Sequence, residues 1–565
     1  MMVGIDLGTT NSLVAYYDGS KVEIIPNRLG EKLTPSVVSL DKDGTILVGK
    51  TAFERGLRYP LSAAAVFKRS MGTDREYLLG DKKFRAEELS SFILRSLKED
   101  AERYLGQPID EAIISVPAYF NDKQRKATKR AGELAGFRVE RIINEPTAAA
   151  IAHGLLDKKE RSKYLVFDLG GGTFDVSILE RTGKIIEVRA IAGDNFLGGE
   201  DFTDVIERLF CEMHNIELTA LSYEERAQLR EHAEQCKLQI SSSDSVKLEC
   251  RINGELKTYT LKADKYEKAC EPLFDRLRRP IERSLRDAGI SASDIDEVVL
   301  VGGATKAAMI RKLAARLFGR IPTASVNPDE AIALGAAIQC GIKQRAAAIR
   351  EVILTDVCPF TLGTEVVSNN GYFEEGGHYL PIIERNTVIP VSRTQRLYTV
   401  GDYQEQIRVK VLQGESRIAK NNLYLGEVCV PVPSKPRGEE SVDVTYTYDV
   451  NSLLEVIVKV NSTDFTKKII IQNEESKISE EEAQKRMEEL SYLKISPREL
   501  EENKLALYLA ERLYEESTGQ RRLGIDRYIS AFERALQTNK QPQIDKARKE
   551  LLEAIEVLGG IDEDM

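Results

Sequence analysis

Two short segments of the sequence combine an apolar strand, a carboxylate and a turn of glycines and hydroxyl residues. The first is Ile5–Ala15, with the sequence IDLGTTNSLVA, and the second is Val166–Leu179, with the sequence VFDLGGGTFDVSIL. Glycine turns let backbone N–H groups close around phosphate oxygens, because no Cβ blocks their approach. Asp6 and Asp168, each at the end of its strand, would face a Mg²⁺ ion through water, since this ion loses its water reluctantly.

One such turn would be weak support for a ligand site, because D-x-G also occurs in plain turns. Two of them, each opening one half of a long α/β region, predict a duplicated fold that holds a nucleotide between its halves. A third segment, Val298–Lys306, has the pattern of a strand, two glycines and a helix start, which suits the adenosine. We expect these segments, and not a Walker-type loop, to hold the nucleotide.

The composition excludes several classes of protein. A chain of 565 residues is too long for one hydrophobic core, so we expect several domains. The net charge of −10 argues against a nucleic-acid partner, and no stretch approaches the ~18–20 apolar residues of a membrane span. The seven cysteines have no C-x-x-C spacing, which argues against a zinc site and a disulfide framework. The first residues lack the pattern of a secretory signal, so we expect a cytoplasmic location.

The sequence pattern changes along the chain and predicts two domains of different class. In residues 1–350, short apolar runs such as Ile113–Val116 alternate with longer helical patterns, as an α/β domain requires. In residues 357–472, apolar and polar residues alternate with period two, most clearly in Ile407–Val411 and Leu454–Val460. The second region is therefore expected to be a β domain.

The last region, residues 473–565, is predicted to be helical. Ser479 and Ser496 each precede a glutamate by three residues, as capping boxes at helix N-termini do. A final helix is expected from Pro542, with an apolar face, to a stop at Gly559 and Gly560.

Residues 351–356, with the sequence EVILTD, form an apolar run between carboxylates where the first two regions meet. Such a run is elsewhere an ordinary buried strand. Its place at a change of composition favours an interdomain linker.

Five motifs resemble, in order, signatures of the seventy-kilodalton heat-shock (DnaK-type) chaperone family. They are Asp6–Ser12, Val116–Asp122, Ile143–Ala150, Asp168–Asp175 and Asn327–Glu330. The resemblance continues through the linker to Leu412–Glu415, weakens in the C-terminal region, and is greatest for the bacterial HscC branch. It implies a multidomain protein: an actin-like duplicated α/β nucleotidase, then a β-sandwich substrate-binding domain, then an α-helical lid.

The resemblance also implies ATP or ADP with Mg²⁺ as cofactors, and it allows K⁺ as a further ion. Asp6 and Asp168 would order the Mg²⁺ through water. The residues that it places on the phosphates are Gly8, Thr9, Thr10, Asn11, Gly170, Gly171, Gly172 and Thr173, and the catalytic residues are Lys68, Glu145, Asp168, Thr173 and Asp175. Without the resemblance, Lys68 would be assigned to a solvated helix face and Glu145 to a turn before Pro146.

The adenosine positions implied by the resemblance include two departures from the family pattern. The positions are Gly199, Glu234, Lys237, Ser241, Gly302, Gly303, Lys306 and Asp329. Ala304 and Lys306 replace the usual polar residue and arginine, so that stacking of a planar guanidinium on the base is lost. We therefore expect a weaker affinity for nucleotide than is typical of the family.

The resemblance further implies a relay between the nucleotide and the linker. The positions concerned are Pro117, Arg125, Arg141, Val352, Ile353, Leu354 and Asp356, with Arg141 and Asp356 at the site of a J-domain co-chaperone. The linker would add to the nucleotidase as an edge strand in one state and leave it in the other. Thr355 stands where a leucine is usual, which would weaken this docked state by about 1–2 kcal/mol.

In the β domain, six positions match the family's peptide cleft: Thr364, Val367, Leu397, Val400, Ile407 and Val409. Isolated apolar residues on strands are usually core residues, and this alternative stays open for Val409. Thr364 and Val367 differ from the family pattern, so we expect a preference for different client polypeptides.

The function implied is that of a monomeric, ATP-dependent chaperone for unfolded or client polypeptides, assisted by a J-domain co-chaperone, with the exchange factor left open. ATP would favour fast peptide exchange, and slow hydrolysis would favour retention. An actin-like filament protein would share the glycine turns but would not need residues 357–565. A small-molecule kinase of the same fold would not explain the linker, β domain and lid together.

Overall fold

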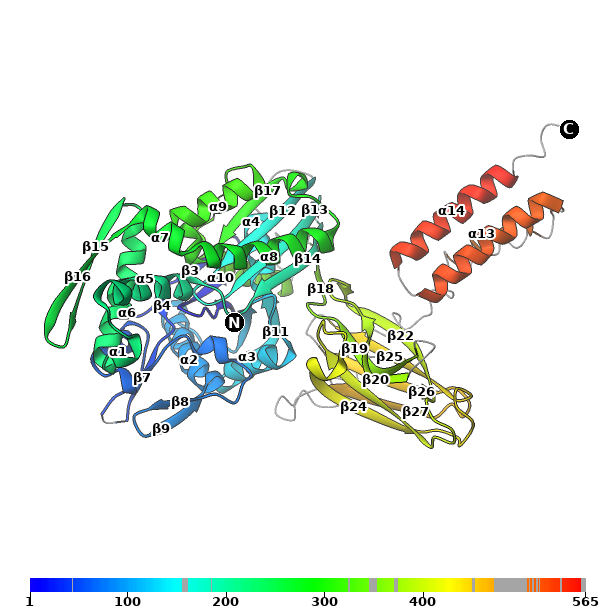
Figure 1. Cartoon of the computed structure of the whole chain (residues 1–565), viewed down its shortest axis with the longest axis horizontal. Helices are drawn as coiled ribbons and strands as arrows, with labels where there is room; N and C mark the ends of the chain where they lie inside the picture. Colours follow the sequence, from blue (N-terminus) through cyan, green and yellow to red (C-terminus); the bar gives the residue numbers. More distant parts are fainter. Residues whose placement is uncertain are drawn as a thin grey trace. The chain divides into compact units, whose positions relative to one another are not determined.

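The computed structural model describes residues 1–42, 44–154, 161–183, 185–323, 326–344, 353–369, 374–449, 453–471, 503, 506–507, 509–510, 513–514, 517, 519–538 and 541–559. These form two compact units (Figure 1). The first contains Met1–Phe360 and Arg385–Ile389, and the second contains Thr361–Glu384, Pro390–Gln472 and the C-terminal helices. The capping boxes at Ser479 and Ser496, and Val352 of the linker, lie outside the described residues.

The first unit contains two related sheets. The sheet of the first lobe, residues 1–154, has the order β11-β10-β1-β2-β3. β1 pairs in parallel with β10 and antiparallel with β2, which pairs antiparallel with β3. The strands are β1 (Met2–Asp6), β2 (Asn11–Tyr17), β3 (Val22–Ile25), β10 (Glu111–Val116) and β11 (Arg138–Asn144).

The sheet of the second lobe repeats this arrangement within residues 161–323 and adds two strands from further along the chain. Its order is β17-β12-β13-β14-β18-β21, with β12 parallel to β17 and antiparallel to β13. The strands are β12 (Arg161–Leu169), β13 (Phe174–Thr182), β14 (Ile185–Asp194), β17 (Glu297–Val301), β18 (Ile353–Val357) and β21 (Val388–Ile389). The duplication predicted from the two glycine turns is therefore present, because β1–β2 and β12–β13 are equivalent hairpins.

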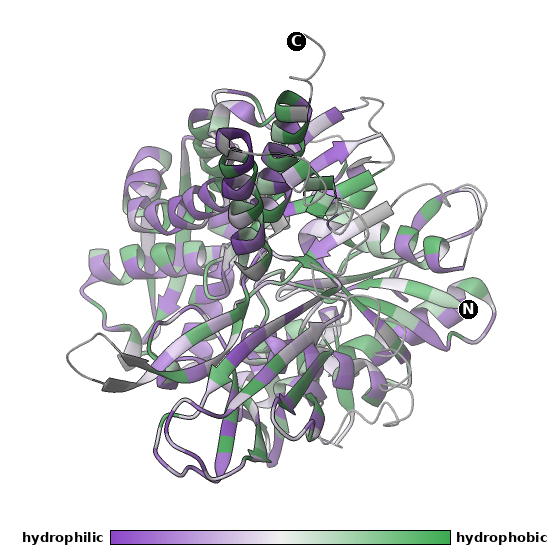
Figure 2. Ribbon diagram, turned by 90° about the vertical axis from the view of Figure 1, so that its right-hand side faces the viewer, coloured by the Kyte–Doolittle hydropathy of each residue, from purple (hydrophilic) through white to green (hydrophobic). Residues whose placement is uncertain are grey.

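Helices pack on both sheets, and in Figure 2 they carry hydrophobic and hydrophilic residues along their length. Helix α10 (Ala331–Lys343) lies directly on β1 and on α4 (Glu145–Gly154): a Cβ on Gly4 would lie 2.2 Å from the Ala337 nitrogen, and one on Gly335 would lie 1.8 Å from the Ala148 oxygen. The remaining helices are α1 (Lys50–Arg58), α2 (Ala86–Leu105), α3 (Asp122–Leu134), α5 (Gly199–His214), α6 (Tyr223–Ile240), α7 (Ala263–Ala269), α8 (Glu271–Ala288) and α9 (Ala308–Phe318).

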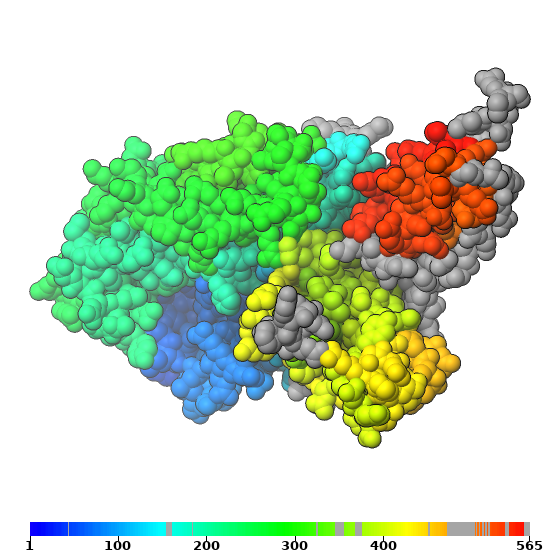
Figure 3. Space-filling view, turned by 45° about the vertical axis from the view of Figure 1, so that its right-hand side comes forward, coloured from blue at the N-terminus to red at the C-terminus, as the bar shows by residue number. Residues whose placement is uncertain are grey.

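Short strands complete the first unit. A side sheet with the order β6-β5-β7 and the hairpin β8–β9 belong to the first lobe, β4 pairs with β2, and the hairpin β15–β16 belongs to the second lobe. The bounds are β4 (Thr34–Pro35), β5 (Val38–Leu40), β6 (Ile46–Val48), β7 (Ala63–Ala64), β8 (Glu76–Leu79), β9 (Lys82–Arg85), β15 (Ser245–Ile252) and β16 (Glu255–Lys262). In Figure 3, the blue surface of the first lobe lies against the green surface of the second.

The segment proposed as a linker enters the sheet of the second lobe. Strand β18 pairs in parallel with β14, with Ile353 opposite Ile185 and Leu354 opposite Ile186. The other edge of β18 pairs antiparallel with β21, a short strand from further along the chain. The backbone of this segment is therefore a strand of the first unit.

The second unit contains two antiparallel four-stranded sheets, with the orders β20-β19-β23-β24 and β22-β25-β26-β27. The Tyr446 hydroxyl of one sheet donates to the Gly363 carbonyl of the other at 3.0 Å. The strands are β19 (Leu362–Asn369), β20 (Glu374–Ile383), β22 (Val391–Tyr398), β23 (Gln406–Gln413), β24 (Leu423–Pro431), β25 (Ser441–Tyr448), β26 (Leu454–Val460) and β27 (Thr466–Ile471). The alternating segments 407–411 and 454–460 both lie in strands, as predicted.

Two helices, α13 (Gly519–Thr538) and α14 (Gln541–Gly559), are described near the C-terminus. Phe532, Ile544 and Leu551 are buried in a cluster that the two helices share with Leu507 and Ala510. The last helix was predicted from Pro542 to Gly559, and its apolar face is confirmed. Within the described residues, no helix combines the length and the apolar character needed to cross a membrane.

Candidate functional site

A cavity of about 340 Å³ lies between the two glycine turns of the first unit. The loop after β1 and the loop after β12 both line it, because each follows the equivalent strand of its lobe. The predicted residues found in its lining are Asp6, Gly8, Thr9, Thr10, Asn11, Lys68, Glu145, Asp168, Gly170, Gly171, Thr173, Gly199, Glu234, Lys237, Gly302, Gly303, Lys306 and Asp329. The sequence analysis therefore located most of this cavity.

The two glycine turns face each other so closely that side chains would collide. A Cβ on Gly171 would lie 1.6 Å from the Thr10 hydroxyl oxygen, and a Cβ on Gly172 would lie 2.5 Å from Cγ2 of Thr9. Glycine is needed here because backbone groups of one turn approach side chains of the other. Hydroxyls and backbone N–H groups thereby converge on the cavity, as phosphate recognition requires.

Four carboxylates and one lysine are buried at the base of the turns. The Lys68 ammonium donates to Oε1 of Glu145 at 2.6 Å, and both side chains are almost fully buried. The Ser115 hydroxyl donates to Asp6 at 3.0 Å, and the Tyr119 N–H donates to Asp175 at 3.1 Å. Lys68 lies on a short 3₁₀ helix, Phe67–Ser70, and its burial overturns the alternative of a solvated lysine.

Burial and mutual repulsion raise the pKa values of three of these carboxylates. Burial, followed by the charge of Glu145, raises the pKa of Asp6 to about 7 and that of Asp175 to about 8. The pKa of Asp168 is raised for the same two reasons. Each of these carboxyls adds, when it loses its proton, a buried negative charge that Lys68 alone does not balance, so the cluster is suited to a cation that replaces the protons.

The cluster fits a magnesium ion held through water. One oxygen of Asp168 and one of Asp175 are buried and have no hydrogen-bond partner among the described residues, so both can bind water or metal. Within the described residues, no three His, Cys, Asp or Glu side chains converge as direct ligands of one metal. Mg²⁺ keeps several of its waters when bound to proteins, so a set of carboxylates at water distance is a suitable site.

A second cavity, of about 510 Å³, continues the first towards the predicted adenosine positions. Gly199, Lys237, Gly303 and Lys306 line both cavities, and Ser241 lines only the second. The Lys306 ammonium contacts the Asp329 carboxylate, and the Lys237 ammonium donates to the Gly199 carbonyl at 2.9 Å. Lys306 is thus paired with Asp329, another of the predicted adenosine positions, and its ammonium group is not free to lie over a base.

Two predicted residues of the phosphate site do not line the cavity. Gly172 packs between Thr9 and Arg69, and Asp175 lies behind the second turn, where it accepts from Tyr119. Asp175 would therefore act through its neighbours rather than by direct contact with a nucleotide.

One segment has the spacing of a Walker loop but lies elsewhere. Gly44–Thr51 reads GTILVGKT, yet Ile46–Val48 is strand β6, whereas a Walker loop would be coil at these positions. Lys50 is half exposed and pairs with Glu31 at 2.6 Å. None of these residues lines the cavity between the glycine turns. The Walker spacing is therefore present in the sequence, and the expectation that the glycine turns hold the phosphates stays a prediction, because this segment lies outside the cavity.

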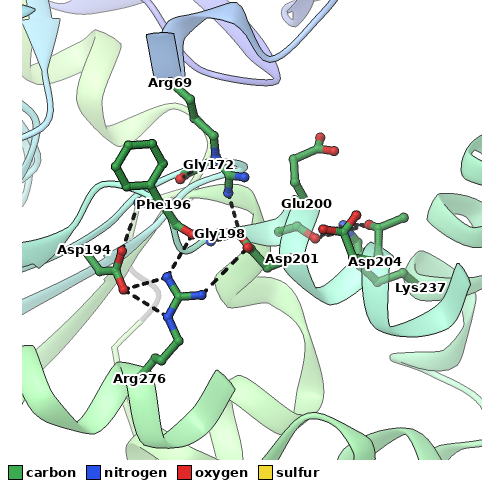
Figure 4. A network of polar contacts seen from close by, with 12 residues as sticks. Arg69, Gly172, Asp194, Phe196, Gly198, Glu200, Asp201, Asp204, Lys237 and Arg276 are labelled. Carbon is green, nitrogen blue, oxygen red and sulfur yellow. Dashed lines mark hydrogen bonds and ion pairs between the residues drawn. The ribbon is translucent and has the colours of Figure 1, made fainter. Parts of the chain in front are cut away.

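Sequence reasoning missed two side chains that the structure connects to the predicted ones. Asn144 accepts from Arg125 at 2.6 Å and donates to Asp356 at 2.8 Å. Arg69 joins the first lobe to the second turn (Figure 4). Asn144 and Arg69 each adjoin a predicted residue, Glu145 and Lys68, and that adjacency was the available signal.

A duplicated fold, with two glycine turns facing each other across a carboxylate-lined cavity, is the arrangement expected of a two-lobed nucleotide-binding protein. The family model described as Hsp70 protein matches residues 2–78 and 75–559. The chain is 42% identical over 513 residues to the chaperone protein DnaK of Thermotoga neapolitana, covering 86% of this chain and 83% of the relative. It is 41% identical over 506 residues to the chaperone protein DnaK of Thermosipho africanus, covering 86% and 82%.

The chain therefore belongs to the Hsp70 family. It is an ATP-dependent molecular chaperone with ATPase activity. The predicted family is confirmed, and the closer likeness to the HscC branch stays a prediction.

The raised pKa values predict that the magnesium-free protein loses stability as pH rises from 6 to 8.5. Asp6 and Asp175 have folded-state pKa values above their ordinary values, so their protonated forms favour the folded state at low pH. This contribution is present in full below the ordinary pKa of 3.8 and is lost progressively as the pH rises to about 7 for Asp6 and about 8 for Asp175, above which the profile becomes flat. The free energy of unfolding in urea with EDTA should fall by at most about 1.4 kcal/mol per pH unit for each carboxyl.

The pH profiles of a double variant and of the wild type test whether these carboxyls cause the pH dependence. The double variant Asp6→Asn/Asp175→Asn should have a flatter profile, because the amides do not titrate. A wild-type profile in EDTA that is flat or rises from pH 6 to 8.5 would contradict the electrostatic description of the cluster.

Proposed function

We propose that this chain binds Mg²⁺ and ATP in the cavity between the glycine turns, and that the state of the nucleotide sets the affinity of the second unit for extended apolar polypeptides. The first unit would be the actin-like nucleotidase, the two antiparallel sheets the substrate-binding β-sandwich, and the helical region the lid. The protein would work in the cytoplasm as a monomer with a J-domain co-chaperone. The observation that carries the proposal is the pairing of β18 with β14, because it joins the interdomain segment to the nucleotidase.

The chemistry at the cavity would be positioning and charge neutralisation. Lys68, fixed by Glu145, would stand beside the terminal phosphate, and Thr173 would hold that phosphate from the second turn. Glu145 would orient the attacking water directly, and Asp175 would do so through its neighbours. Phosphoryl transfer depends mainly on such positioning of the reacting groups and on charge neutralisation. Asp6 and Asp168 would hold Mg²⁺, which neutralises phosphate charge when bound.

A chain of polar contacts connects the linker strand to this cavity. Asp356 accepts from Asn144, which directly precedes Glu145. Arg125 donates to Asn144 and to the carbonyls of Ala118 and Phe120, in the loop whose Tyr119 N–H binds Asp175. If β18 left the sheet, the contact between Asp356 and Asn144 would be lost. The positions of Glu145 and Asp175 would therefore depend on whether the linker strand is docked.

The charges around Asp356 make this end of the linker sensitive to its partners. Burial raises the pKa of Asp356, and the charges of Arg125 and Arg141 oppose that increase. A co-chaperone that contacted Arg141 would change the balance at Asp356, in agreement with the role proposed for both residues.

A second contact supports docking of the interdomain region on the nucleotidase. Arg385 donates twice to the Asp287 carboxylate of α8, with both bonds 2.9 Å long. Asn386 accepts from the Ile191 N–H at 3.1 Å, next to the edge where β18 pairs. These residues precede β21, so β21 is held by them and β18 is held by its pairing with β14.

The proposed peptide cleft draws on residues with different exposure. Val367 and Val400 are exposed, and Leu397 is half-buried, so these side chains are available to a client. Ile407 and Val409 are buried, which favours the core alternative left open for Val409. Thr364 is fully buried and its hydroxyl lacks a hydrogen-bond partner among the described residues.

Replacement of Thr173 by alanine tests the proposed cycle. The hydroxyl would hold the terminal phosphate, so Thr173→Ala should lower single-turnover hydrolysis by about 10²-fold while Mg·ATP still binds. Client polypeptides captured by the full chain with ATP should then dissociate as quickly as in the ATP state of the wild type, with no later phase of slow release. Thr128→Ala, which removes a buried hydroxyl that donates to the Gln124 carbonyl at 3.0 Å on α3, serves as a control for loss of a threonine hydroxyl. Normal turnover in Thr173→Ala would contradict the assignment.

A further inference from the structure

The side chain of Arg69 crosses from the first lobe to the second. It follows Lys68 on the 3₁₀ helix Phe67–Ser70, which begins after Val66 in the left-handed region at a φ of 57°. A β-branched residue rarely adopts this conformation, so the surrounding structure must impose it. The turn directs two consecutive cations to different targets: Lys68 to Glu145 within the first lobe, and Arg69 to the second lobe.

Arg69 makes two polar contacts with the second lobe. Its Nε donates to the Gly172 carbonyl at 2.9 Å, and one terminal nitrogen donates to the Asp201 carboxylate at 2.5 Å. The two side chains are only 19% and 17% exposed, so water screens the pair incompletely. Figure 4 shows the guanidinium between the second glycine turn and the start of α5.

Asp201 is also held by groups of the second lobe itself. The Gly198 N–H donates to the same carboxylate at 2.8 Å, at the N-terminus of α5. Arg276 lies 4.0 Å from its other oxygen and binds Asp194 at 2.7 Å and the Phe196 carbonyl at 2.9 Å. Figure 4 shows these groups around the same bend of the chain. The second lobe therefore presents a fixed carboxylate to a cation of the first.

The contact with Gly172 sets the direction of the next amide. In a planar trans peptide, the carbonyl of one residue and the N–H of the next point in opposite directions. Because the Gly172 carbonyl faces Arg69, the Thr173 N–H faces away from it. Lys68 and Thr173 line the cavity between the turns, whereas Arg69 and Gly172 do not. Arg69 thus acts on the phosphate site through its neighbours.

We propose that Arg69 is a positioning residue with two separable roles. Its charge pair with Asp201 keeps the two lobes closed on the bound nucleotide and so slows nucleotide release. Its bond to the Gly172 carbonyl orients the Thr173 amide and so supports hydrolysis. This inference rests on the nucleotide site proposed above.

The test measures nucleotide release and hydrolysis separately in the full chain. A fluorescent ADP analogue bound with Mg²⁺ is displaced by excess unlabelled ADP, and single-turnover ATP hydrolysis is followed in parallel. Arg69→Ala and Asp201→Asn should each speed release about tenfold, and the double variant should be no faster, because both substitutions remove the same charge pair. Asn at position 201 still accepts from the Gly198 N–H, so the start of α5 is preserved.

Arg69→Lys separates the two roles. A lysine keeps a charge for Asp201 but has a single nitrogen, so it cannot bind both partners. Release should stay within about threefold of the wild type, while hydrolysis should fall about tenfold. A loss of folding alone would change both rates together. Arg161→Ala, which breaks the pair of Arg161 with Glu180 inside the second-lobe sheet, is the matched control and should leave both rates unchanged.

The outcomes are distinct. Release from Arg69→Ala and Asp201→Asn within twofold of the wild type, or effects that multiply in the double variant, would overturn the proposal. A wild-type chain that binds no ADP in the presence of Mg²⁺ would instead overturn the nucleotide site on which it rests.

Discussion

Replacement of Lys68 by alanine should lower turnover of bound ATP by about 10²–10³-fold. Lys68 is the positive charge among four buried carboxylates, and it is bonded to Glu145 at 2.6 Å. Its loss would remove the cation beside the terminal phosphate and leave Glu145 buried without its partner. The measurement is single-turnover hydrolysis, with binding of Mg·ADP measured in the same preparation.

Two further variants separate chemistry from folding. The double variant Lys68→Ala/Glu145→Gln removes one positive and one negative charge, so it should recover stability but not turnover. Lys83→Ala removes an exposed lysine of the same lobe that pairs with Glu76, and it should behave as the wild type. Turnover by Lys68→Ala within threefold of the wild type would show that Lys68 is only structural.

Replacement of Asp356 by alanine should uncouple the nucleotide from the peptide. The substitution removes the hydrogen bond between Asn144 and Asp356, which is 2.8 Å long and joins the linker strand to the residue before Glu145. Coupling energies between sites are typically 1–3 kcal/mol, so acceleration of peptide release by ATP should fall by about 5–150-fold. Release of a fluorescent peptide from the full chain, with ATP and with ADP, measures this ratio.

Asp356→Asn is the matched variant, because its side-chain oxygen can still accept from Asn144. It should keep part of the coupling, whereas Asp74→Ala, which removes an exposed carboxylate of the first lobe, should keep all of it. If Asp356→Ala responds to ATP as the wild type does, the contact between Asn144 and Asp356 is not part of the relay.

The local patterns were sufficient to predict the secondary-structure classes and the two glycine turns, whereas other cavity residues, such as Lys68 and Glu145, were implied only by the family resemblance. The glycine turns could be read from the sequence because phosphate recognition needs glycine and hydroxyl residues at fixed spacing after a strand. The segment 454–460 could be predicted to be a strand because alternation of apolar and polar residues with period two is typical of a half-buried strand.

Contacts between distant segments could not be predicted in this way. Asn144 and Arg385 are ordinary polar residues in their local sequence, and their roles depend on which residues the fold brings to them. Spacing alone would also have been misleading at Gly44–Thr51, where the spacing of a Walker loop occurs in a strand and a helix start. The strand β18 was ambiguous for a related reason, since an apolar run has the same composition in a linker and in a sheet.

The proposed cycle requires a magnesium-dependent nucleotide site in the first unit. The nucleotide bound there must change the rate at which the second unit releases a bound polypeptide. The most direct measurement is the dissociation rate of a fluorescent unfolded polypeptide from the full chain with Mg·ATP, with Mg·ADP, and with ATP in EDTA. We predict fast release with Mg·ATP and slow release under the other two conditions. Equal release rates under all three conditions would contradict the account.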